Sequence, residues 1–74
     1  MKETVINYIE DNINYARENR GTQLVDVFMG HAFGALQLYC RLVFEKNPGE
    51  ENDMIYRWNN GWRLEFEHLR YMKP

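Results

Sequence analysis

The chain has 74 residues, of which 45% are hydrophobic and 27% are charged, with nine Lys and Arg against eleven Asp and Glu. This length allows one small domain, residues 1–74, and a net charge of −2 excludes both a disordered acidic tail and a strongly basic nucleic-acid arm. The single cysteine, Cys40, excludes an internal disulfide, and no cluster of Cys and His offers a zinc site, so we expect no metal or other cofactor.

The first predicted element is a helix over residues 2–18. Its apolar side chains gather on one side at 3.6 residues per turn, and Tyr8 and Tyr15, seven residues apart, lie together on a flank of that side. We expect their rings to cover the edge of the core while their hydroxyl groups stay in water. Gly21 suits the left-handed residue after a helix and Thr22 suits the N-cap of the next one, so the joint should be short.

The second predicted element is a helix over residues 22–46. The chain is almost continuously apolar from Leu24 to Lys46, and the helix ends before Pro48 because proline disfavours helical geometry at the preceding residue. At about 100° per residue, the polar and glycine positions form one narrow stripe: Asp26, Gly30, Gly34, Gln37 and Arg41. One other helix and a short tail are too little to cover the remaining surface. This excess of apolar surface predicts that a second chain covers part of it, as in a homodimer.

Residues 24–44 are also long enough to cross a membrane. Against that interpretation, Asp26 and Arg41 would lie in or near the hydrocarbon, where such a charge costs about 2.5–3.5 kcal/mol at mid-bilayer. The N-terminal segment lacks the basic start and apolar stretch of a secretory signal. We therefore expect a cytoplasmic protein with no membrane partner.

The third predicted element is a β-hairpin with strands over residues 54–58 and 62–68, which makes the predicted fold class α+β. Its large apolar residues occupy even-numbered positions: Met54, Tyr56, Trp58, Trp62, Leu64 and Phe66. A three-residue loop with Gly61 in the left-handed position pairs Trp58 with Trp62 and puts all of these side chains on one face.

The alternative is an all-α, three-helix fold. A helix through the same segment would place Asn59–Gly61 in its middle, at a cost of roughly 2 kcal/mol relative to alanines. It would also leave Met54, Tyr56 and Leu64 off its apolar stripe. We therefore favour the hairpin.

No residues combine into a catalytic motif. His31 and Cys40 are nine residues apart on one helix and lie on opposite sides of it, so they form no thiol and imidazole dyad. The paired carboxylates belong to solvated segments, and a chain this small rarely encloses a pocket. We expect a protein that is not an enzyme. An oligomeric enzyme with an interface site built from Asp26, His31 and Arg41 is a remaining alternative.

The predicted function is a small non-catalytic module that binds another protein, as a subunit, adaptor or inhibitor, and also binds itself. Gly30 and Gly34 have the spacing that lets two helices approach closely, although neutral exposure explains them equally well. The predicted interface residues are Gly30, Phe33, Gly34, Tyr56, Trp58 and Trp62. For the four aromatic residues of the hairpin, including Phe66, a place in the chain's own core is the competing interpretation.

A small regulatory nucleic-acid-binding protein is the alternative function. Arg57, Arg63 and Arg70 of the predicted hairpin would contact phosphate groups, while Trp58 or Trp62 would stack on bases. The last 25 residues nevertheless hold four basic and five acidic side chains, so no net positive field would attract a polyanion there.

Overall fold

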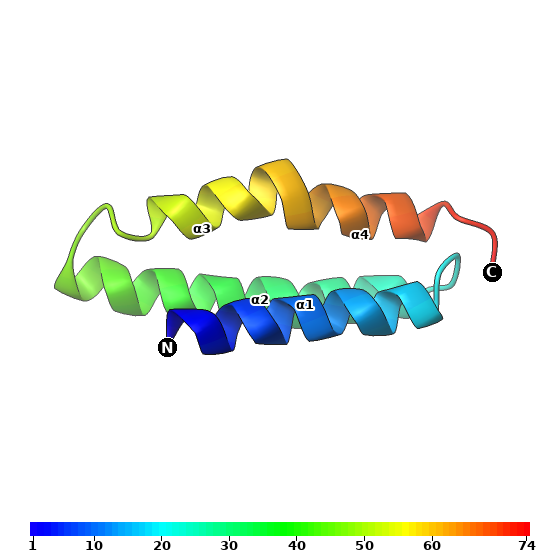
Figure 1. Cartoon of the computed structure of the whole chain (residues 1–74), viewed down its shortest axis with the longest axis horizontal. Coiled ribbons are helices and arrows are strands. Elements are labelled where there is room, and N and C mark those ends of the chain that lie inside the picture. Colours follow the sequence, from blue (N-terminus) through cyan, green and yellow to red (C-terminus); the bar gives the residue numbers. More distant parts are fainter.

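The computed structural model describes all residues from Met1 to Pro74 and contains helices and loops but no strand. α1 (Lys2–Glu18) and α2 (Leu24–Lys46) agree with the first two predicted helices, except that α2 begins two residues later than expected. A third helical segment, residues 52–70, comprises α3 (Asn52–Arg57), the π-helical turn η1 (Trp58–Trp62) and α4 (Arg63–Arg70). α1 and the third segment both run antiparallel to α2 (Figure 1), in a rod 42 Å long.

The predicted α+β fold with a C-terminal β-hairpin is wrong: the chain is an all-α, three-helix bundle. Both predicted strands are helical, and the buried residues of the segment follow a four-residue spacing: Met54, Trp58, Trp62 and Phe66. Tyr56 and Leu64, which were expected on the same apolar face, are 67% and 49% exposed. The alternation was misleading because a four-residue repeat falls only on even-numbered positions and therefore resembles a two-residue repeat.

The π-helical turn η1 reconciles this four-residue spacing with a helix. Each four-residue step in a regular α-helix advances by about 400°, which is about 40° beyond a full turn. Three such steps, from Met54 to Phe66, would rotate the last side chain by about 120°, away from the core. A π turn is wider because its hydrogen bonds join residues five apart. It takes up the excess rotation, so that Trp58, Trp62 and Phe66 are all buried.

The polar residues Asn59–Gly61 lie on the exposed side of the widened turn. The side-chain amide of Asn60 donates to the Tyr56 carbonyl at 2.9 Å, and the Arg63 guanidinium donates to the Asn59 carbonyl at 3.3 Å. Side chains thus provide hydrogen bonds to backbone carbonyls at the point where the regular α-helical pattern is interrupted. The helix cost expected for Asn59–Gly61 from the sequence did not include these hydrogen bonds.

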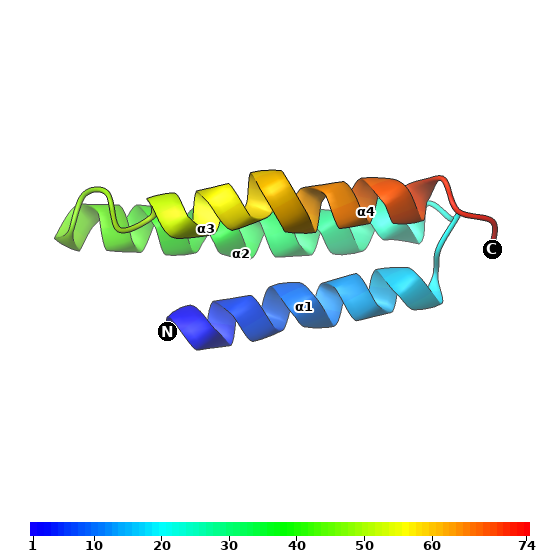
Figure 2. The ribbon, with the colours of Figure 1, turned by 45° about the horizontal axis from the view of Figure 1, so that its top comes forward.

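The core lies along the line where the three helical segments meet. Phe66, Ile9, Met54 and Val25 are among the fully buried side chains, so each segment contributes to it. α1 and the third segment pack on different sides of α2, as Figure 2 shows. The remainder of the α2 circumference therefore has no helix of this chain against it.

Polar contacts join the helical segments to one another. Lys2 forms an ion pair with Asp53 at 2.8 Å, and Arg17 forms one with Glu65 of α4. In the joint between α1 and α2, Gly21 has φ of 75°, and its N–H donates to the Leu69 carbonyl at 2.9 Å. A Cβ at Gly21 would collide with a backbone carbonyl of the C-terminal segment. The predicted left-handed glycine thus also permits a close approach between two distant segments.

Candidate interaction surface

The side of α2 that faces away from the bundle is apolar. Leu38 is 60% exposed, Leu24 and Val27 are each 47% exposed, and Leu42 is 40% exposed. At about 100° per residue, these four positions and His31 lie within one sector of about 60° around the axis of α2. The smaller residues Gly34 and Ala35 lie on either side of this sector, about halfway along α2. The excess of apolar surface expected from the sequence of α2 is therefore present on the folded chain.

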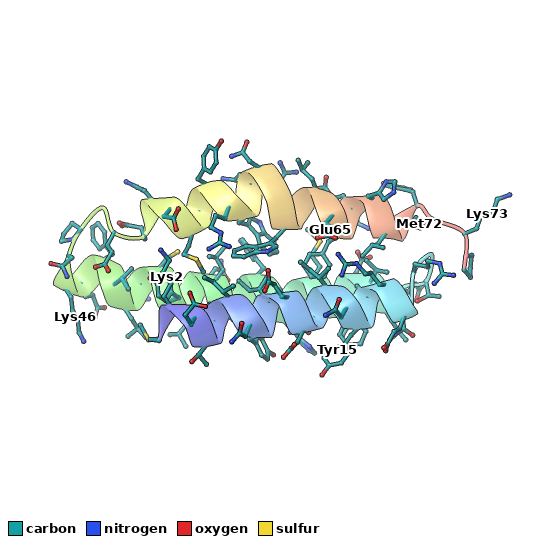
Figure 3. All side chains as sticks on the ribbon, viewed as in Figure 1. Lys2, Tyr15, Lys46, Glu65, Met72 and Lys73 are labelled. Atoms are coloured by element: carbon teal, nitrogen blue, oxygen red, sulfur yellow. The ribbon has the colours of Figure 1, made fainter.

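α1 extends this surface with two tyrosines. The ring centroids of Tyr15 and Phe28 are 5.5 Å apart, and Phe28 meets the His31 ring edge-on at 6.2 Å. Because α1 and α2 are antiparallel, Tyr8, two turns before Tyr15, lies on the same flank opposite Ala35, two turns after Phe28. Both tyrosines are nearly half exposed. In Figure 3, Tyr15 points away from the third segment, on the opposite side of α1 from Glu65.

We call this surface the α1–α2 face. Its residues are Tyr8, Tyr15, Leu24, Val27, Phe28, His31, Ala35, Leu38 and Leu42. None of them is Asp, Glu, Lys or Arg. Two exposed carboxylates adjoin these residues: Asp11 lies between Tyr8 and Tyr15 on α1, and Glu45, which Arg41 approaches at 3.7 Å, lies at the angle of Val27 beyond Leu42. A largely apolar surface that contains tyrosines is typical of a protein–protein interface.

The unequal lengths of α1 and α2 enlarge the exposed surface. α1 has 17 residues and α2 has 23, so α2 is longer by about 9 Å at 1.5 Å per residue. Figure 1 shows the C-terminal end of α2 extending beyond the N-terminus of α1. Phe44, in this overhang, is 56% exposed. The two neighbouring segments are thus unable to cover α2 along its full length.

A second surface feature is a groove between α2 and the third segment. It consists of two hollows of about 380 and 430 Å³, which share Phe33 and Trp58. The rings of these two residues are 5.3 Å apart. Arg63 and Arg70 line the first hollow, but Arg63 is paired with Glu67 at 2.9 Å and Arg70 with Asp26 at 2.8 Å. Carboxylates therefore neutralise both guanidinium groups.

Three of the predicted interface residues, Gly30, Phe33 and Trp58, line the first hollow of the groove, and the other three do not. Trp58 and Trp62 are core residues, only 4% and 7% exposed, whereas Tyr56 projects from the third segment into solvent. Phe33 remains 41% exposed beside Trp58. Gly30 and Gly34 are exposed, and a Cβ on either would meet nothing within 4 Å. Neither glycine is in a close helix contact within this chain.

Of the three predicted anion contacts, two lie together and the third, Arg57, lies apart from them. Arg63 and Arg70 line the groove beside α2. Arg57 lies over the Trp62 ring, 4.8 Å from its centroid, and that ring borders Ile13 of α1. The hairpin that was expected to present all three arginines to phosphate groups does not exist.

The residues of the enzyme alternative make separate contacts. Asp26 is bonded to Arg70, Arg41 approaches Glu45, and His31 packs against the Phe28 ring. The half-buried thiol of Cys40 has a raised pKa because burial disfavours the thiolate, with a smaller contribution from the charge of Glu51. No three His, Cys, Asp or Glu side chains are close enough together to hold a metal ion.

By length and composition alone, α2 is the one helix that would be able to cross a membrane. Its most apolar 18-residue window is 22% buried in the bundle. Comparisons with protein-family models, curated proteins and solved structures found no match to this chain.

The α1–α2 face was not identified as a site from the sequence. Tyr8 and Tyr15 were assigned to the edge of the core, and Leu24, Val27 and Leu38 to the general apolar surface of the helix. Predicting the face would have required the directions from which α1 and the third segment approach α2. Those directions depend on tertiary packing, which periodicity along one helix does not contain.

Proposed function

We propose that the protein is a small, non-catalytic interaction module that binds a protein partner, either a copy of itself or another protein, through the α1–α2 face. The observation that carries this proposal is the exposure of large apolar and tyrosine side chains on one side of α1 and α2, among them Tyr8, Tyr15, Leu38 and Leu42. The proposal includes a cytoplasmic location, which the free thiol of Cys40 supports.

The exposed area of this face provides a binding energy of useful size. Full burial of a Val or Leu side chain contributes about 1.5–3 kcal/mol, so covering the exposed half of four such residues contributes roughly 4 kcal/mol. Tyr8 and Tyr15 add aromatic area at a low cost in side-chain entropy. These contributions must exceed the loss of translational and rotational freedom on association.

Site-specific photo-crosslinking in cells tests the proposal. A benzoylphenylalanine is placed at Leu38 or Tyr15 on the face, and at Tyr56 on the outer side of the third segment as the matched control. We expect discrete protein adducts, to this chain or to another, from the first two positions and none from Tyr56. Equal adduct patterns from all three positions, or no protein adduct from the face, would refute the proposal.

One observation favours single-stranded nucleic acid binding as a second candidate function. The first hollow of the groove brings Arg63 and Arg70 together with the rings of Phe33 and Trp58. Basic groups beside aromatic rings are the combination that single-strand binders use. Against it, Asp26 and Glu67 neutralise both guanidinium groups. Binding of a labelled oligonucleotide that weakens steeply with added salt would support this function, and no binding at low salt would eliminate it.

A further inference from the structure

We infer that the occupant of the α1–α2 face is a second copy of this chain, related by a two-fold axis so that the two α2 helices pack antiparallel. This inference rests on the proposed function and names its partner. Packed face to face, the two copies would form two layers of two helices, α1 and α2 of one copy against α1 and α2 of the other, with the third segments outside. Three features of the face support a self-complementary arrangement.

The first feature is the distribution of side-chain sizes along α2. Larger apolar residues lie at both ends of the face and smaller ones lie near its middle. A two-fold axis between His31 and Ala35 sets Leu24 opposite Leu42 of the second copy, and Val27 opposite Leu38 of the second copy. It also sets His31 opposite the small Ala35 of the second copy, so that a large side chain meets a small one. Two parallel helices in register would instead place His31 against His31.

The second feature is the distribution of charge. The α2 residues of the α1–α2 face are uncharged, so the contact between the two α2 helices brings no like charges together. At the edge, the antiparallel arrangement brings the joint between α1 and α2 of one copy near the C-terminal end of α2 of the other. Arg20 in that joint donates only to the Arg17 carbonyl and has no carboxylate partner within the chain. Glu45, at the opposite end of the face, has an exposed carboxylate whose one partner within the chain is Arg41, at 3.7 Å.

The third feature is the size of the face. α1 is about 26 Å long at 1.5 Å per residue, and two helices whose axes are 8–10 Å apart present a surface roughly 20 Å wide. Two such faces bury about 1,000 Å² in total, which is at the lower end of specific interfaces. We therefore expect a dimer that dissociates at micromolar concentration, and not a permanent one.

Sedimentation equilibrium of the full chain from 1 to 500 µM tests the use of this face. We expect a monomer–dimer equilibrium that Leu38→Glu weakens at least tenfold. Gln37→Glu is the matched control, because it adds the same charge at the neighbouring residue, on the polar stripe of α2. We expect that control to dimerise as the wild type does. A wild type that stays monomeric throughout, or equal weakening by both variants, would overturn the inference.

Cysteine crosslinking tests the two-fold arrangement. In a Cys40→Ala background, Leu24→Cys and Leu42→Cys are made in separate chains of different mass, mixed at 500 µM and oxidised. The antiparallel dimer should yield the mixed disulfide between positions 24 and 42. Disulfides between identical positions should be rare, because those positions are about 27 Å apart along the helices. Dominant 24–24 and 42–42 products would overturn the arrangement, and circular dichroism of each variant checks that it is folded.

These results separate failure of this inference from failure of the proposed function. If the wild type is monomeric but Leu38 and Tyr15 crosslink in cells to a different protein, the homodimer is refuted and the interaction module stands. If the wild type is monomeric and no protein crosslinks to the face, both are refuted.

Discussion

Deletion of Gly61 tests the explanation of the third segment. In the wild type, the buried residues from Met54 onward are spaced by four, four, four and three residues. Removing Gly61 changes this to four, three, four and three, which is the repeat that a regular α-helix holds on one face. We expect η1 to become an ordinary α-helical turn while Trp62 and Phe66 remain in the core.

The expected change in unfolding free energy is small. Removing a glycine from a helix interior gains about 1 kcal/mol. Loss of the hydrogen bond from Asn60 to the Tyr56 carbonyl costs about 1 kcal/mol. The two effects nearly cancel, so we expect the urea midpoint to stay close to the wild-type value.

Deletion of Gln37 from the regular helix α2 is the matched control. It removes an exposed residue too, but rotates everything downstream by about 100°. Tyr39 and Val43 would leave the core, at a cost of about 1.5–3 kcal/mol each. Urea unfolding followed by circular dichroism measures both variants. If the Gly61 deletion destabilises as much as the Gln37 deletion, the explanation of the π turn is incorrect.

Four further predictions concern stability. Gly21→Ala should lower the unfolding free energy by at least about 1–2 kcal/mol, the cost of a left-handed alanine, and by more because the new Cβ meets a backbone carbonyl. Gly30→Ala, at an open helical position, should raise the unfolding free energy by up to about 1 kcal/mol. Urea titration measures both variants. Phe66→Ala should cost about 3–5 kcal/mol in calorimetry, and a loss below 1 kcal/mol would show that this ring is not central to the core. The hydrogen bond from Lys2 lowers the folded-state pKa of Asp53, so the stability from this pair is present above the unfolded-state pKa and is lost as pH falls through the folded-state value. Asp53→Asn should therefore lose less stability than the wild type between pH 5 and about pH 2, and identical pH profiles would contradict this assignment.

The residues of the candidate site could not be predicted from the sequence. Trp58 and Trp62 were considered as anchors for a partner because large aromatic residues often are. The bundle buries both, and leaves Leu24, Val27, Leu38 and Leu42 exposed instead. These aliphatic residues are indistinguishable by periodicity from the apolar residues of α2 that are buried. Their exposure depends on the directions from which α1 and the third segment approach.

Local sequence determined α1, α2 and the joint between them. The 3.6-residue repeat of Ile6, Ile9 and Ile13, the position of Gly21 and the break at Pro48 act within a few residues, so each can be recognised without knowing the rest of the fold. Tertiary structure decided the third segment. Its buried residues repeat every four positions, which a regular α-helix does not keep on one face, and the segment is not a strand. Burial of Trp58, Trp62 and Phe66 against the two other helices stabilises the π turn that accommodates this repeat. Tertiary packing likewise decided which part of α2 stays exposed, because a helix has one continuous surface and only its neighbours divide that surface into core and interface.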